Sequence, residues 1–157
     1  MEIARELKDT ENALREFVAA VLARNLGEDW IDKCGISKAK IEVWRKRKAE
    51  AESQVQPMRG EEPPIYYAPF DDLLTLIKKN WEYEFQSVFP DQNTIEVYLK
   101  TLEKFLDTEQ ARRELFIFQK HLVLGITGEI RSRIIAYRSL LEVGKDGFPR
   151  IESIHDS

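Results

Sequence analysis

The sequence predicts an all-α protein, a bundle of four to five helices with a long C-terminal helix. Apolar residues recur at spacings of three, four and seven, which is typical of the buried face of a helix. No convincing stretch alternates apolar and polar residues as a strand does. The chain has 157 residues, of which 43% are hydrophobic and 33% charged. That size suits one domain with its own core, which we expect over residues 1–147, followed by a tail over 148–157.

The first half of the chain predicts two long helices. One ends near residue 26, where Gly27 supplies a residue that adopts the left-handed conformation at low cost. Its apolar stripe consists of Ile3, Leu7, Leu14, Phe17, Val18, Val21 and Leu22. A short helical turn over about 28–33 follows, and Gly35 ends it. Ser37 is then suited to cap a second helix over about 37–54, most of whose positions are charged.

Residues 55–69 contain four prolines and Gly60, a composition that excludes a helix. We interpret them as a connector within one domain, because neither half of the chain alone would make a convincing domain. A third helix is expected near residue 70, where Asp71 and Asp72 suit the dipole at a helix N-terminus. Its buried face is expected to comprise Phe70, Leu73, Leu74, Ile77 and Trp81, and to continue through Phe85 and Phe89.

The rest of the chain predicts two more helices. Asp91, Asn93 or Thr94 caps the first of them. The second is the long C-terminal helix, expected over about 108–142. Its apolar face, with spacings of four and seven, is expected to hold Leu115, Leu122, Ile126, Ile130, Ile134, Tyr137 and Leu141.

Composition excludes several classes of protein. The formal net charge is −4, which excludes a globally cationic binder. The single cysteine, Cys34, excludes a disulfide framework and a multi-cysteine zinc site, and we interpret it as a structural thiol. The two histidines, His121 and His155, are too few for a histidine-built metal centre, so we expect no metal or other cofactor. Without a bilayer-length apolar run or a signal peptide, the chain is expected to be cytoplasmic and not membrane-bound.

Positive charge is concentrated in two segments. Residues 33–48 hold seven basic side chains and one glutamate, and residues 112–138 hold six basic side chains and two glutamates. Such clusters are able to follow a phosphate backbone, with Trp44 as a stacking surface. The expected nucleic-acid-binding residues are Lys38, Lys40, Trp44, Arg45, Arg47, Lys48, Arg112 and Lys120. The alternative is a solvated helix face whose cations pair with Glu42, Glu50 and Glu52.

Arg113 and His121 form a second candidate site in the long helix. They lie eight residues apart and are therefore neighbours on the helix rather than strictly in line. A cation beside an imidazole lowers its pKa, and a neutral histidine is able to abstract a 2′-hydroxyl proton while arginine holds the phosphate. The alternative is a partly buried histidine on a helix flank, because the sequence offers no evident second acid–base group.

Two glycines lie inside the same helix, Gly125 and Gly128, where each costs about 1 kcal/mol relative to alanine. We favour close packing against another helix or a second subunit as the reason. A ligand against the bare backbone, or a kink, is the alternative.

The middle of the chain resembles the HEPN superfamily of all-α domains, and its Swt-type branch most closely. The residues that carry the resemblance are IYYAPFDDLLTLIKKNWEYEFQSVF over 65–89, together with GEDW over 27–30 after the opening helix. The resemblance implies a metal-independent ribonuclease scaffold that uses an R-x4–6-H motif and often works as a homodimer.

The segment where that motif is expected departs from the pattern. Leu106 stands in place of the arginine and Ala111 in place of the histidine, while Asp107 matches the polar residue between them. Neither aliphatic side chain binds phosphate or transfers a proton. The resemblance therefore implies a domain that has lost catalysis. A literal match at Arg150 and His155 lies in the tail and is attributed to chance.

The leading hypothesis is a catalytically inactive, HEPN-like module that binds RNA or a partner protein, in a defence or toxin–antitoxin setting. A homodimer formed through the long helices is expected. One alternative is an active endoribonuclease that uses Arg113 and His121. Another is a structural, homodimeric bundle that binds a partner protein and ignores nucleic acid.

Overall fold

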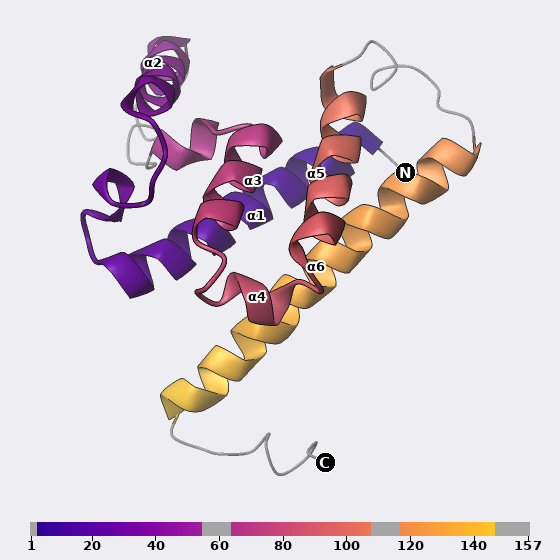
Figure 1. Ribbon diagram of the computed structural model, residues 1–157. Helices are drawn as coiled ribbons and strands as arrows, with labels where there is room; N and C mark the ends of the chain where they lie inside the picture. Colours follow the sequence, from indigo (N-terminus) through magenta and orange to yellow (C-terminus); the bar gives the residue numbers. More distant parts are fainter. Residues whose placement is uncertain (1–2, 55–63, 108–116, 147–157) are drawn as a thin grey trace.

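The computed structural model describes residues 3–54, 64–107 and 117–146, and these ranges contain helices and no strand (Figure 1). The predicted all-α class with a long C-terminal helix is confirmed. The elements in chain order are α1 (Ile3–Leu26), the 3-10 helix η1 (Trp30–Asp32), α2 (Lys38–Gln54), the 3-10 helix η3 (Pro64–Tyr67), α3 (Phe70–Lys79), α4 (Phe85–Val88), α5 (Gln92–Asp107) and α6 (Ile117–Asp146).

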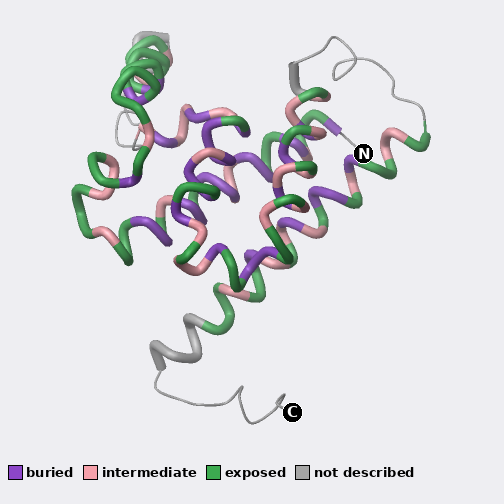
Figure 2. Tube along the Cα trace, in the orientation of Figure 1, coloured by how far each residue is buried: buried purple, intermediate pink, exposed green. Residues whose placement is uncertain are grey.

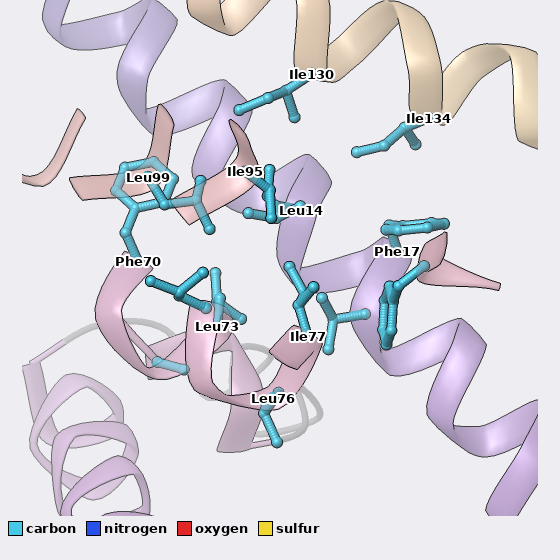
Figure 3. Close-up of a cluster of buried hydrophobic side chains, with 14 of the residues drawn as sticks. Leu14, Phe17, Phe70, Leu73, Leu76, Ile77, Ile95, Leu99, Ile130 and Ile134 are labelled. Atoms are coloured by element: carbon cyan, nitrogen blue, oxygen red, sulfur yellow. The ribbon is translucent and has the colours of Figure 1, made fainter. Parts of the chain in front are cut away.

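Helix α1 is at the centre of the fold. It packs along α6 and also contacts α3, α5 and both 3-10 helices, while α3 packs against α5. Side chains from α1, α3, α5 and α6 meet in one hydrophobic core (Figure 3). Fully buried representatives are Leu14 of α1, Leu73 of α3, Ile95 of α5 and Ile130 of α6. The core is therefore one contiguous cluster, as expected for a single domain.

An aromatic group ties α1 to the later helices. The ring of Phe17 makes edge-to-face contacts with Phe85, Phe89 and Tyr137, at centroid distances of 5.6, 5.8 and 5.3 Å. Such pairs contribute about 0.5–1.5 kcal/mol each beyond the area they bury. They fix the position of α4, and of the middle of α6, on the same stretch of α1.

Helix ends follow the predicted chemistry. Gly27 has φ of +96° and its amide donates to Ala23 O, which closes α1. Ser37 Oγ accepts from the amide of Lys40 at the start of α2. Of the three candidate caps for α5, Asp91 makes the bond, accepting from the amide of Thr94 at 2.7 Å.

Two predicted boundaries differ from the structure. The third helix does not continue to Phe89 but stops at Lys79, because the buried side chain of Asn80 donates to Leu76 O and to Cys34 O. That second bond comes from a distant loop and draws the chain out of the helix. The last described helix continues to Asp146 rather than ending near 142, and its predicted start near 108 is not tested. Residues 108–116 and the predicted tail lie outside the described residues.

Helix α2 stands apart from the main bundle and packs chiefly on η3 (Figure 1). It buries Ile41 and Trp44. Asp72 of α3 supplies a polar anchor: its carboxylate accepts from Trp44 Nε1 at 2.7 Å and from Lys40 Nζ at 2.8 Å. The carboxylate raises the pKa of the Lys40 ammonium group. Trp44 and Asp72 thus connect an otherwise polar helix to the core.

The anchor predicts an asymmetry between two adjacent aspartates. Asp72→Ala leaves the buried Trp44 Nε1 without its acceptor and is expected to lower the free energy of unfolding by about 2–3 kcal/mol. Asp71→Ala removes an exposed carboxylate from the same helical turn and is expected to cost less than about 1 kcal/mol. Urea titrations of both variants measure the difference. Equal losses would mean that Asp72 contributes only to the helix dipole.

Candidate interaction surfaces

The basic face of α2 is largely engaged within the chain. Lys40 binds Asp72, Arg45 pairs with Glu42 at 3.3 Å, and Arg47 donates to Tyr67 O at 3.1 Å. The prediction that Trp44 is a stacking surface is wrong, because its side chain is fully buried and bound to the Asp72 carboxylate. A tryptophan spaced among cations gives no sign, in sequence alone, of which way its ring faces.

Of the other predicted cations, Lys38 and Lys48 share a side of α2 with Arg45, whereas Lys120 lies on another helix. Lys38 is exposed at the start of α2 and Lys48 is half-buried near its middle. Lys120 is half-buried on α6, which does not pack against α2. Arg112 lies outside the described residues. RNA binding through α2 stays a prediction, now with fewer unengaged cations than the sequence suggested.

The predicted catalytic positions are not brought together by the described residues. Leu106 and Asp107 lie in the last turn of α5, but the structure does not describe their side chains. Ala111 and Arg113 lie wholly outside it. His121 is exposed on the outward side of α6. The Arg113–His121 pair therefore stays a prediction.

Helix α6 presents two faces of opposite exposure. Its buried face holds Val123, Ile126, Ile130 and Ile134, which pack towards the core. At about 100° per residue, the opposite direction runs through Gly125, Gly128 and Ser132, and all three are exposed. Leu122, predicted for the inner face, is 47% exposed and belongs to the outer one.

The outward face of α6 is nearly free of charge. Five of the exposed large apolar side chains of the described residues lie on it, whereas only Val43 and Val97 lie elsewhere. Figure 2 shows the exposed positions recurring along the helix. We define the outward face of α6 as Ile117, Phe118, His121, Leu122, Gly125, Gly128, Ser132, Ile135, Ala136, Ser139 and Leu140.

Charged side chains on α6 flank this face and are held by other groups. Arg131 pairs with Glu6 at 2.9 Å, and Arg138 pairs with Glu16 at 3.2 Å, both on α1. On the other flank Arg133 binds Glu129 and also donates to Val88 O. A surface helix ordinarily has its charges on the side opposite the core. Here they lie on the flanks, so the outward face is apolar for about 35 Å.

The two glycines of α6 do not face another helix among the described residues. A Cβ added at Gly125 or Gly128 would meet nothing within 4 Å. Packing against another helix of the same chain, one form of the predicted close approach, is therefore not found in the described ranges. Packing against a second subunit stays a prediction.

A separate cleft lies between α1, α2 and η3. It has a volume of about 490 Å³ and is lined by Lys8, Asn12, Arg15, Glu16, Arg47, Tyr66 and Tyr67. The α1 residues of this cleft are not among the site residues predicted from the sequence. The only sequence signal was their spacing, since residues 8, 12, 15 and 16 fall on one side of a helix.

Other candidate chemistries find no support in the ranges that the structure covers. No group of three or more His, Cys, Asp or Glu side chains able to hold a metal ion occurs there. Cys34 is 1% exposed, and burial raises the pKa of its thiol, which leaves it protonated and unreactive.

None of the described helices is both long enough and apolar enough to cross a membrane.

Comparisons with protein-family models, with curated proteins and with solved structures find no match for this chain.

The burial of Cys34 predicts slow thiol chemistry. In native buffer a maleimide is expected to modify it at least about 100-fold more slowly than in denaturing urea, because the thiol must first become exposed. The rate is measured by mass spectrometry over time. A native rate close to that in urea would contradict the burial of this side chain.

Proposed function

We propose that this chain is a non-catalytic helical interaction module that works as a homodimer, formed by packing the outward face of α6 against the same face of a second copy. The observation that carries the proposal is the largely apolar outward face itself, where the charge of Glu129 is paired with Arg133 of the same helix. Its large apolar side chains are 47–72% exposed. Contiguous exposed apolar patches on a soluble protein mark interaction sites.

The order of residues along the face favours a second copy as the occupant. A two-fold dimer requires a surface that is complementary to itself. With an axis between Gly128 and Glu129, an antiparallel pair sets Ile117 at the level of Leu140 of the second copy and Leu122 at the level of Ile135, on opposite edges of the contact. Large apolar residues then line both edges of the contact towards both of its ends.

The same register sets small residues together near the axis. Gly125 faces Ser132 of the second copy, and Glu129 faces Gly128, where no side chain competes for space. The two backbones are thereby able to approach closely at the centre. This gives the glycines inside α6 a reason that the protomer alone does not provide.

The size of the face predicts a dimer of moderate strength. A single helix pair about 35 Å long and about 10 Å wide gives an interface below the standard size of about 800 Å² per partner. We therefore expect dissociation in the micromolar range rather than an obligate dimer. The flanking ion pairs of Arg131 and Arg138 are satisfied within each protomer, so binding need not break them.

This proposal is compatible with the HEPN-like hypothesis but does not rest on it. A scaffold with Leu106 and Ala111 at the motif positions lacks the groups for phosphodiester cleavage. His121 sits on the proposed interface, opposite Ala136 of the second copy, so it is expected to be covered in the dimer. The proposal thus treats His121 as an interface residue and not as a general base.

One prediction tests the register of the proposed interface. Leu122→Lys and Ile135→Glu each place a charge in an apolar contact and are expected to weaken self-association by at least about 30-fold. Mixing the two variants is expected to restore association only in part, because the antiparallel register sets the two opposite charges at the same level but on opposite edges of the contact. Analytical ultracentrifugation across a micromolar dilution series measures both effects.

Val97→Glu is the matched control, because Val97 is an exposed apolar residue on α5 rather than α6. It is expected to leave self-association unchanged. A wild-type protein that is monomeric throughout the series would overturn the homodimer. A mixture of the two α6 variants that fails to associate, while the wild type dimerises, would overturn the antiparallel register.

A second prediction separates folding from association. Gly125→Leu is expected to raise the free energy of unfolding of the diluted protomer by about 0.5–1 kcal/mol, because leucine favours the helix and the space around it is open. The same side chain fills the centre of the proposed interface and is expected to weaken dimerisation about tenfold or more. Stronger dimerisation in this variant would contradict close approach at Gly125.

The endoribonuclease alternative has its own test. The proposal expects His121→Ala to leave any RNA cleavage by the purified protein at background level, as in the wild type. Wild-type cleavage that this substitution abolishes would replace the present proposal with the enzymatic one. A gel assay with labelled RNA, with and without a chelator, measures it.

A further inference from the structure

We propose that the cleft between α1, α2 and η3 binds a small organic phosphate monoester. The site lies on residues other than those of the outward face of α6. It combines fixed cations, hydroxyl-bearing aromatic walls and a volume suited to a small molecule.

The arginine in the floor of the cleft is held rigidly. Arg15 is 7% exposed, and its guanidinium donates to Ala68 O and Asn12 Oδ1, each at 2.9 Å. It also pairs with Glu11 at 3.3 Å. These contacts fix its position before any ligand arrives, which lowers the entropic cost of binding. Arg15 is therefore a rigid part of the cleft wall rather than a mobile contact, and Glu11 balances its charge.

The cleft carries more positive than negative charge. Glu11 balances Arg15, and Glu16 pairs with Arg138 of α6. Two lining cations then lack a carboxylate partner within the described ranges. One is Lys8, and the other is Arg47, which donates to the Tyr67 carbonyl, a neutral acceptor.

Two unbalanced cations match the charge of a phosphate monoester, about −1.5 to −2 near neutral pH. A guanidinium also provides the fork of donors that phosphate oxygens accept.

The walls of the cleft indicate an organic body on the ligand. Tyr66 and Tyr67 are half-buried and line it from η3, so their rings offer apolar surface beside the cations. At about 490 Å³ the cleft falls within the usual range for small-molecule sites and is larger than a bare phosphate ion needs. An aromatic phosphomonoester combines both features in a compact probe.

The test uses phenyl phosphate as the probe, with the full-length protein and isothermal calorimetry at low salt and pH 7.5. Lys8→Gln and Arg47→Gln are each expected to weaken binding about tenfold. Lys46→Gln is the matched control, since it removes the same charge from the residue next to Arg47 without touching the cleft. It is expected to leave the affinity unchanged.

Two further arms define the ligand. Inorganic phosphate is expected to bind at least about fivefold more weakly than phenyl phosphate, because it cannot contact the tyrosine rings. A 5′-phosphorylated RNA oligonucleotide is expected to bind no more tightly than phenyl phosphate at moderate salt. Tighter RNA binding would assign the site to a nucleic-acid end and overturn the small-molecule assignment.

Three results would overturn the inference outright. They are the absence of binding at millimolar phenyl phosphate, an affinity that Lys8→Gln and Arg47→Gln leave unchanged, and equal affinity for inorganic phosphate. Circular dichroism of the variants verifies that each remains folded. The Leu122→Lys variant is expected to bind phenyl phosphate as the wild type does, so failure of the dimer and failure of this site are distinguishable.

Discussion

The packing of α6 along α1 is the contact on which the rest of the structure depends. It joins the first helix of the chain to the last and closes the core around Ile130 and Ile134. The ion pairs of Arg131 with Glu6 and of Arg138 with Glu16 lie along the same contact and fix the rotation of α6 about its axis. Because that rotation is fixed, the residues that face outward are fixed as well.

The outward face of α6 differs in composition from that of an ordinary surface helix. Such a helix gains solubility by turning charged residues to water, and its stability comes from the apolar side alone. Here the charged residues hold the flanks, and glycine, serine and alanine alternate with large apolar residues on the outside. This arrangement leaves apolar area exposed to water, and Gly125 and Gly128 lower the intrinsic helix propensity of α6. The proposed contact with a second copy would cover this face and account for both costs together.

The sequence predicted the helices well where local patterns decide them. Glycine at the end of α1, serine before α2 and aspartate before α5 act through bonds to nearby backbone; the first two are predicted outright and Asp91 is one of three predicted candidates. It failed where a distant partner decides. Asn80 ends α3 through a bond to Cys34 O, and Trp44 turns inward to a carboxylate on another helix. Neither partner is visible from spacing along one segment.

The same limit applies to the candidate sites. The spacing of the cations on α2 predicts a nucleic-acid-binding surface, but it does not show their partners. Asp72 binds Lys40 and the Tyr67 carbonyl binds Arg47. The cleft is not predictable from the sequence, because its walls come from three separate segments. For α6, the four-and-seven spacing did mark the helix, but Leu122 satisfies that spacing and yet faces outward. A spacing of seven residues does not show which side of a helix faces the core when neither side carries charge.

The attachment of α2 has a consequence for how the protein unfolds. Helix α2 is joined to the rest of the chain chiefly through η3 and through the contacts of Ile41, Trp44 and Asp72, whereas α1, α3, α5 and α6 share one interior. Elements with few buried contacts open as separate cooperative units, at a free energy below that of global denaturation. The amide hydrogens of α2 are therefore expected to exchange with deuterium through a partial opening that leaves the remaining helices assembled.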